Sequence, residues 1–435
     1  MGSIWIIFIL RTLFGIFRLI FVLIWNVFAD IINYFLLYHE KRCAEKNNAI
    51  RRQVENVSVA NASDEINAAY QYRGALVTGN NKAMRDEITS AIVLGSMQRG
   101  IPCIIMHGDK SVLPARVSGH GNVIRIGEPG KHYDPFMFLP DYEIREMLTK
   151  DSDEHLEPGA VKYLKGMLDF LHLRNAKPSI YLLHNCPHDQ LSDNINRMIR
   201  EGALDQQRGR SILQTLNGGI DYRDVVSDRI NALYTHLKSL TALSASPKEY
   251  VNIAEAVDSG KSLLIDMPTD ESGFLIRSIM RNIKHAAGAG ARVCLVFDGA
   301  SLSEDIVSEL IESQKTACVF SYENMPEQLL YNDKLANSVF SHSSDVYITT
   351  TVNGTNAKFL SENIGTYKKK TQSTSVKHGG VPITTFHPIG LDRSYSYAEI
   401  DEPKLTVEEL CRISAESYVH VSTGSSQITS VSITR

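Results

Sequence analysis

The chain contains 435 residues, enough for more than one domain with a substantial buried core. Its formal net charge of −4 excludes binding of nucleic acid through overall positive charge, so any such contact requires a local basic patch. The six cysteines are scattered and form no CxxC pair, which is typical of reduced cysteines in a cytosolic compartment rather than of a disulfide framework.

The first predicted element is an almost wholly apolar stretch from Ile4 to Tyr38. A membrane span needs about 20 apolar residues, so two spans and a turn would barely fit, and the stretch crosses once or lies partly in the surface. The following segment "HEKRCAEKNNAIRR" is rich in basic residues and indicates that the remainder is cytoplasmic. We predict an anchor in the cell inner or plasma membrane over residues 1–40, and a linker or stalk over residues 41–70. Polar residues share one face of the anchor and are expected to contact other helices or the membrane surface: Arg11, Arg18, Asn26, Asp30 and Asn33.

From residue 72 the sequence alternates apolar strand-like runs with amphipathic helix-like segments. Such alternation predicts an α/β fold with a mostly parallel sheet covered by helices on both faces. Between residues 141 and 244 the apolar spacing becomes helical, which predicts an all-α insert. The polar stretch "YKKKTQSTSVKHGG" is interpreted as a solvated loop, although its lysines could also contact DNA phosphates. The predicted strands are "GALVTG", "GIPCIIMH", "GNVIRIGEP", "KSLLIDMP", "ARVCLVFDG", "TACVFSY", "DVYITTTV" and the alternating C-terminal tail.

The strand–turn–helix segment from Ala75 to His107 has the layout of a phosphate-binding loop. Such a loop needs a second glycine for close backbone approach, a lysine for the phosphates and a Ser or Thr hydroxyl for Mg²⁺. In "GNNKAMRD" these positions are Met84, Arg85 and Asp86, which favours a helix that caps itself. An alternative is that Lys82 reaches a phosphate from an altered loop. The candidate nucleotide-binding residues are Gly79, Asn80, Asn81, Lys82, Arg85 and Asp86.

Two further segments contain residues of the kinds that bind metal ions. In "RVCLVFDGAS" a hydrophobic strand ends in Asp298, as a carboxylate for the Mg²⁺ shell does, but Gly299 follows where a catalytic Glu is expected. Alone, the pair is more typical of an ordinary strand-end turn. In "LHNCPHDQ" the alternate spacing of His184, Cys186 and His188 is not that of a zinc site, so we predict no metal there.

The order of these segments resembles the type IV coupling protein family, the TraG/TraD group of membrane-anchored hexameric DNA pumps, related to FtsK and HerA. The resemblance extends from Gly74 almost to the C-terminus. It rests on Asp109-Lys110 after the second strand, "KHYDPFMFL", "VNIAEAVDSGKSLLIDMPTD", "LVFDG", "ACVFSYEN", where Glu323 takes the place of a Gln, "SDVYITTTVNGTNAKFLSENIGT" and "PKLTVEELCRISAESYVHVS". It implies a RecA-like domain over residues 71–140 and 245–435. It also implies an all-α substrate-facing domain over residues 141–244.

The departures from the family fall on its chemical positions: Met84, Arg85, Asp86, Gly299 and Glu323. We therefore expect a pseudo-ATPase without a catalytic residue, in which Asp298 and Glu323 are remnants and no cofactor binds. It would act as an adaptor that recruits DNA or protein in a conjugation or type IV secretion system. It would take its place in a hexameric ring, formed either by its own copies or together with an active paralogue. Two alternatives stay open. One is an active DNA translocase that binds ATP and Mg²⁺ through a non-standard loop; the other is a membrane-anchored scaffold unrelated to secretion.

Overall fold

The computed structural model describes the chain except for residues 1, 71–72, 109, 151–157, 242–248, 269–271, 287–291, 301, 303, 313–315, 326–332, 378–391 and 435. The contacts within the chain group it into two compact units. Unit 1 comprises Met1–Glu55 and Ile364–Thr406, and unit 2 comprises Asn56–Asn363 and Val407–Arg435.

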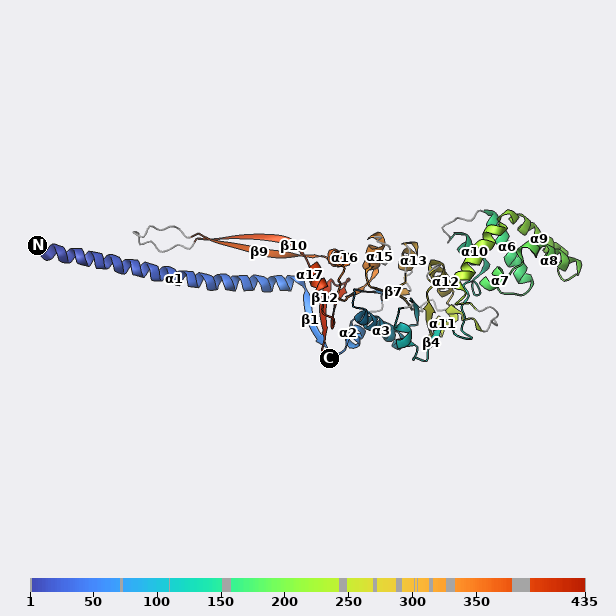
Figure 1. The fold of residues 1–435 in the computed structure, drawn as a ribbon, viewed down its shortest axis with the longest axis horizontal. Coiled ribbons are helices and arrows are strands. Elements are labelled where there is room, and N and C mark those ends of the chain that lie inside the picture. Colours follow the sequence, from blue (N-terminus) through green and yellow to red (C-terminus); the bar gives the residue numbers. More distant parts are fainter. Residues whose placement is uncertain are drawn as a thin grey trace. The chain divides into compact units, whose positions relative to one another are not determined.

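Unit 1 contains a long helix, α1 (Gly2–Arg52), and an antiparallel hairpin of β9 (Thr366–Lys377) and β10 (Asp392–Pro403) (Figure 1). The interpretation of "YKKKTQSTSVK" as a solvated loop is wrong, because these residues form β9; the last three residues of that stretch lie outside the described part. Lysines of β9 face acidic residues of β10, and such cross-strand pairs contribute roughly 0.2–1 kcal/mol each. The family resemblance implied one RecA-like domain that includes residues 245–435. The contacts within the chain instead group residues 364–406 with α1.

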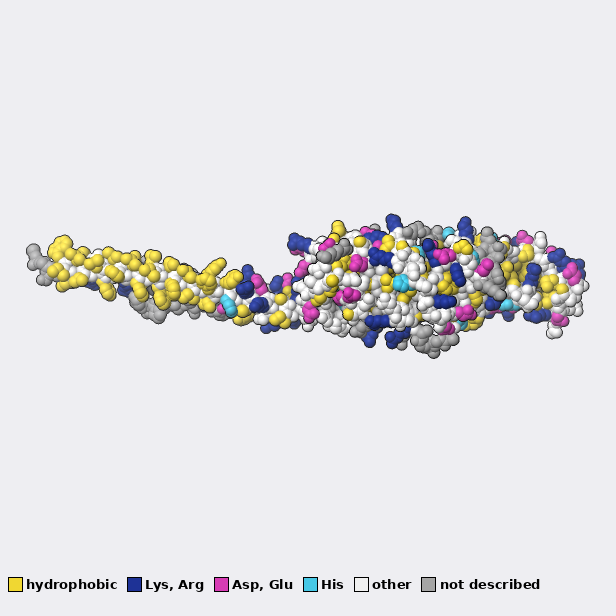
Figure 2. All heavy atoms as spheres, turned by 90° about the horizontal axis from the view of Figure 1, so that it is seen from below, with side chains coloured by type: hydrophobic (Ala, Val, Ile, Leu, Met, Phe, Trp, Pro, Cys, Tyr) yellow, Lys and Arg dark blue, Asp and Glu magenta, His cyan; other side chains and the backbone are white. Residues whose placement is uncertain are grey.

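Helix α1 is continuous over 51 residues, so the apolar stretch and the basic segment after it belong to one helix. Among the described residues, one segment has the length and composition of a membrane span: Trp5–Trp25, with a mean hydropathy of 2.4. Its side chains are exposed along their length, for example Phe14 at 75% and Phe17 at 74% (Figure 2). Apolar surface of this extent is unfavourable in water, at about 25 cal/mol per Å².

Unit 2 is built on a ten-stranded sheet in the order β1-β12-β11-β8-β2-β7-β6-β3-β5-β4. The strands from β8 to β4 run parallel to one another, and β11 and β12 continue the sheet in an antiparallel sense. The mostly parallel α/β fold is therefore confirmed. The strand bounds are β1 Val54–Val59, β2 Ala75–Thr78, β3 Cys103–His107, β4 Val123–Arg125, β5 Ser262–Asp266, β6 Val293–Asp298, β7 Thr316–Tyr322, β8 Asp345–Ile348, β11 Ser417–Ser422 and β12 Gln427–Ile433.

Helices cover both faces of this sheet (Figure 1). Because side chains alternate along a strand, Ala75 and Val77 of β2 face a core formed with α3, while Leu76 faces the opposite layer. On one face lie α2 (Ala62–Ala69), α3 (Lys82–Gln98) and α4 (Leu113–Val117). The remaining helices of the α/β part are α11 (Ile253–Asp258), α12 (Ser272–Lys284), α13 (Glu304–Glu312), α15 (Asp333–His342), α16 (Gly354–Ile364) and α17 (Val407–Cys411).

The stretch between β4 and β5 begins with turns and a bridge between His132 and Tyr250, and its regular elements among the described residues are helices. Near its start, the carboxylate of Asp134 accepts hydrogen bonds from the backbone N–H of Phe136 and of Ile180, both at 2.9 Å, and so joins the segment after β4 to α7 (Ile180–His184). Complete burial raises the pKa of Asp134 to about 7, against the effect of these amides. The helices are α5 (Asp141–Lys150), α6 (Pro158–Leu173), α7 (Ile180–His184), η1 (His188–Gln190), α8 (Leu191–Arg200), α9 (Gln206–Asn217), η2 (Ile220–Tyr222) and α10 (Arg223–Leu237).

Candidate functional site

The sheet brings the sequence-predicted site residues to one edge. Strands β2, β6, β7 and β8 run parallel, so the residues after their carboxyl ends lie close together. These residues are Gly79 after β2, Asp298 at the end of β6, Glu323 after β7 and Thr349 after β8. This is the edge at which open α/β sheets bind ligands, so the geometry of its groups decides whether a phosphate fits.

The connection from β2 to α3 is a turn of residues 79–81, because α3 begins at Lys82. Gly79 N donates to the carbonyl of Glu323 at 3.2 Å, and Asn80 N donates to the carbonyl of Thr350 at 2.6 Å. A phosphate-binding loop directs such backbone amides at the ligand. Here these two amides are directed at protein oxygens instead.

The N-terminus of α3 is capped by Asn81. Its side-chain Oδ1 accepts from Met84 N at 3.2 Å, and its backbone carbonyl accepts from Arg85 N at 3.0 Å. The side-chain Nδ2 of Asn81 also donates to the carbonyl of Ala415 at 2.8 Å. The cap satisfies a helix N–H group that would otherwise attract an anion, and it is supplied by Asn81. The sequence led us to expect this role for Asp86, which instead pairs with Lys82.

Gly79 is required by close packing. Its φ is +121°, and a Cβ at this position would lie 2.4 Å from the Oγ1 of Thr349 and 2.6 Å from its carbonyl oxygen. The hydroxyl of Thr349 is also bonded to the carbonyl of Thr78 at 3.2 Å. The segment after β8 therefore lies directly against the turn after β2.

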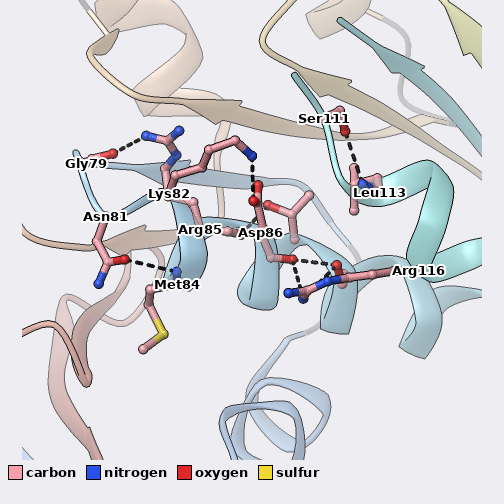
Figure 3. Close-up of polar contacts among 11 residues, drawn as sticks. Gly79, Asn81, Lys82, Met84, Arg85, Asp86, Ser111, Leu113 and Arg116 are labelled. Carbon is pink, nitrogen blue, oxygen red and sulfur yellow. Dashed lines mark hydrogen bonds and ion pairs between the residues drawn. The ribbon is translucent and has the colours of Figure 1, made fainter. Parts of the chain in front are cut away.

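Arg85 is folded back onto the turn. Its guanidinium donates to the carbonyl of Gly79, and the residue is only 8% exposed (Figure 3). Burial lowers the pKa of Arg85, and the nearby carboxylates of Glu323, Asp86 and Asp298 counter this effect by favouring the charged form. The hydrogen-bond acceptor of the Arg85 guanidinium is thus the Gly79 carbonyl, and the nearby carboxylates favour its charged form.

Lys82 and Asp86 form a second pair on the first turn of α3. Lys82 Nζ lies 2.5 Å from Asp86 Oδ2, and the backbone carbonyl of Asp86 accepts from Arg116 at 3.1 Å (Figure 3). In the alternative in which Lys82 contacts a phosphate, this pair must first separate. Asp86 also occupies the position where a Ser or Thr hydroxyl would meet Mg²⁺.

Glu323 and Asp298 have different surroundings. Glu323 is exposed and its Oε1 accepts from Asn80 Nδ2 at 3.2 Å, while Asn80 Oδ1 accepts from Val352 N at 2.7 Å. Asp298 is 9% exposed, and its backbone carbonyl accepts from Gly108 N at 3.2 Å. Asn80 therefore ties the turn after β2 to the segments after β7 and β8.

The residues at this edge do not fit an ATP–Mg²⁺ complex bound in the manner of a phosphate-binding loop. The turn lacks a second glycine, the amides of Gly79 and Asn80 have protein acceptors, and the side chain at the lysine position points back at Gly79. Sequence reasoning missed the contribution of Thr349, Thr350 and Val352, and that of Ala415. The only sequence feature that marks the first three is the Thr-rich run after β8, and this run adjoins the turn only in the folded sheet.

The other candidate residues lie elsewhere. Asp109 is outside the described residues. His184 Nδ1 lies 2.7 Å from Asn231 Oδ1 and its ring stacks on Tyr234, while His188 Nδ1 lies 3.2 Å from the hydroxyl of Tyr163. The lysines of "YKKK" belong to the hairpin of unit 1. None of these described residues adjoins Gly79 through a contact that the structure defines.

No family model and no curated protein matches the sequence. Among solved structures, the chain is similar to the plasmid coupling protein TrwB in complex with ADP and Mg²⁺, at 14% identity and a TM-score of 0.51 over 84% of this chain and 85% of that one. It is equally similar to TrwB with a non-hydrolysable ATP analogue, at 14% identity and a TM-score of 0.51 over 83% and 86%. Unbound TrwB, a bacterial conjugative coupling protein, gives 12% identity and a TM-score of 0.50 over 84% and 85%. The fold is therefore a RecA-like α/β fold similar to that of TrwB.

Proposed function

We propose that this protein is a coupling-protein-like subunit of a conjugation or type IV secretion system that works without ATP hydrolysis. Its role is that of an adaptor or structural component that recruits a DNA or protein substrate. The similarity of fold to TrwB supports the choice of system. The proposal that it does not hydrolyse ATP rests on the turn after β2. It rests above all on Arg85, whose guanidinium donates a hydrogen bond to the carbonyl of Gly79.

The membrane location is part of the same proposal. The span Trp5–Trp25 would anchor the chain in the inner or plasma membrane, with unit 2 in the cytoplasm. The basic residues that follow the apolar stretch support this orientation: Lys41, Arg42, Lys46, Arg51 and Arg52.

The partners we propose are other components of the secretion system. The chain would take a place in a hexameric ring, either with further copies or beside an active paralogue that supplies the ATPase activity. The helical residues 141–244 would form the recruiting domain, inserted in a RecA-like domain over residues 71–140 and 245–435. The helices α5 to α10 in the insert support this division.

Nucleotide binding to the full-length chain in detergent tests the proposal. A ligand that binds only the folded state at a hundredfold excess over its Kd adds about 2.7 kcal/mol of stability. We expect thermal melting and equilibrium dialysis with Mg-ATP to show neither stabilisation nor bound nucleotide. Stabilisation together with turnover that Arg85→Ala abolishes would establish the active translocase instead. Stabilisation that Lys82→Ala abolishes would establish binding through the altered loop.

Genomic context distinguishes the secretion role from an unrelated scaffold. We expect the neighbouring genes to encode a relaxase, a secretion ATPase or an active coupling protein. Co-purification of the full chain with such a neighbour, lost on deletion of residues 158–237, would support the recruiting role of the helices. A gene neighbourhood without any secretion component would contradict it.

A further inference from the structure

The β9–β10 hairpin of unit 1 has two edges, and α1 covers one of them. Asn48 Nδ2 donates to the carbonyl of Lys370, and Lys370 N donates to Asn48 Oδ1, both at 3.0 Å. Arg51 donates to the carbonyl of Lys368 at 3.3 Å. These side chains satisfy backbone groups that would otherwise be open on the outer edge of β9.

The register of the hairpin shows where the backbone groups of β10 point. Lys370 faces Glu399, and Lys368 faces Asp401. Because both backbone groups of Lys370 point at α1, Lys370 and Glu399 form a non-hydrogen-bonded pair of the antiparallel ladder. The N–H and C=O of Glu399 therefore point away from β9. Because the direction of these groups alternates along a strand, the N–H and C=O of Asp401 point away from β9 as well.

This outer edge of β10 is open among the described residues. The sheet consists of β9 and β10 alone, so the structure shows no strand beyond β10. Ile400 is 54% exposed, and the other side chains from Ser396 to Asp401 are exposed as well. An edge of this kind presents a row of N–H and C=O groups that can pair with an added strand.

Two acidic residues, Glu399 and Asp401, lie at the positions of β10 whose backbone groups point outward. Asp401 forms no ion pair with a described residue, and Glu399 keeps 47% of its side chain exposed although Arg51 and Lys370 lie at 3.5 and 3.8 Å. Glu402, in contrast, is held by Lys369 at 2.9 Å. A strand with basic residues would complement the edge, as Lys368 and Lys370 do on the opposite side.

We propose that the outer edge of β10 binds an extended segment of a partner protein that has Lys or Arg at alternate positions, which adds a third strand to the hairpin. A second copy of this chain is a poorer occupant. The outer edge of its β9 is already bonded to α1, and parallel in-register pairing of two β10 strands places Glu399 and Asp401 beside their own copies.

The probe is a fluorescent nine-residue peptide that alternates lysine with valine, titrated into the full-length chain in detergent. We expect saturable binding by fluorescence anisotropy. The matched control has the same sequence with N-methyl groups on alternate amides, which keeps the charge but removes the donors of the ladder. Equal binding of the two peptides would show attraction of charge alone and would overturn the proposal.

Two substitutions at one position separate backbone pairing from charge. Asp401→Pro removes an outward N–H, which β9 does not use, whereas Asp401→Asn keeps the N–H and removes the charge. We expect Asp401→Pro to weaken binding about tenfold or more through the lost hydrogen bond and charge, and Asp401→Asn to weaken it less. Similar thermal melting of both variants establishes that the hairpin is retained. Loss of self-association in Asp401→Pro, without peptide binding to the native chain, would identify a second copy as the occupant and overturn the proposal.

Discussion

The guanidinium of Arg85 donates a hydrogen bond to the backbone carbonyl of Gly79, six residues earlier. The side chain at the position of a phosphate-binding lysine therefore points back from α3 to the turn after β2. Three nearby carboxylates, of Asp86, Asp298 and Glu323, favour its charged form. This relationship makes Arg85 part of the folded framework, and its removal should affect stability before it affects any ligand.

We predict that Arg85→Ala destabilises unit 2 by about 3 kcal/mol, because it leaves the carbonyl of Gly79 without its donor and removes a buried positive charge close to Asp298 and Glu323. The matched control is Lys82→Ala on the same helical turn. Lys82 pairs with Asp86 but keeps 45% of its side chain exposed, so its loss should cost less than about 1 kcal/mol. Urea unfolding followed by circular dichroism measures both. Equal effects of the two substitutions would contradict the structural role of Arg85.

The close approach of Thr349 gives a second prediction. Gly79→Ala should destabilise unit 2 strongly, by about 3 kcal/mol or more, since the new Cβ would lie 2.4 Å from the Thr349 hydroxyl at a φ of +121°. Gly299→Ala is the matched control: φ is +73° there, but nothing lies within 4 Å of the new Cβ. Its cost should be about 1 kcal/mol, from the backbone conformation alone. A milder effect at Gly79 than at Gly299 would show that the segment after β8 does not occupy the site.

The fold and the site differ in how far the sequence predicts them. Strands such as β3 and β6 are short apolar runs between amphipathic helices, so the local pattern of apolar residues was sufficient to predict them. The hairpin was missed because β9 consists mostly of Ser, Thr and Lys, and because Asn48, which bonds to β9, lies far away in the sequence. Substitutions at Met84 to Asp86 indicated an altered loop. The atoms that fill its place come from Thr349 to Val352 and from Ala415, which only the sheet brings near.

A buried histidine outside the candidate site predicts a dependence of stability on pH. His420 Nε2 lies 2.9 Å from Asp345 Oδ1, and Nδ1 lies 3.7 Å from Glu65 Oε1. Burial opposes the charged ring, but the hydrogen bonds and charges of Asp345 and Glu65 outweigh it and raise the pKa of His420 to about 9. The folded state thus binds this proton more tightly than the unfolded state, in which a histidine has a pKa of about 6.5.

The stabilising contribution of His420 is therefore fully present below about pH 6.5 and is lost as the pH rises through about 9. Its size is about 3 kcal/mol at most. We expect the free energy of unfolding in urea to fall between pH 6.5 and 9, and the fall to be smaller in His420→Gln, which cannot take up the proton. Parallel curves for the two proteins over this window would refute the assignment to His420.

The last prediction concerns α1 and the membrane. The span Trp5–Trp25 has 21 residues, which at 1.5 Å per residue matches a hydrocarbon core of about 30 Å. Cys43 is exposed on the same helix, about 27 Å beyond Trp25 at that rise, on the side of the basic segment. An impermeant maleimide should therefore label Cys43 in inverted membrane vesicles but not in intact spheroplasts, and Cys43→Ser serves as the control for other thiols. A chain truncated to residues 39–435 should leave the membrane fraction on carbonate washing, whereas the full chain should stay. Labelling of Cys43 in intact spheroplasts would reverse the orientation, and release of the full chain by carbonate would show that α1 does not span the bilayer.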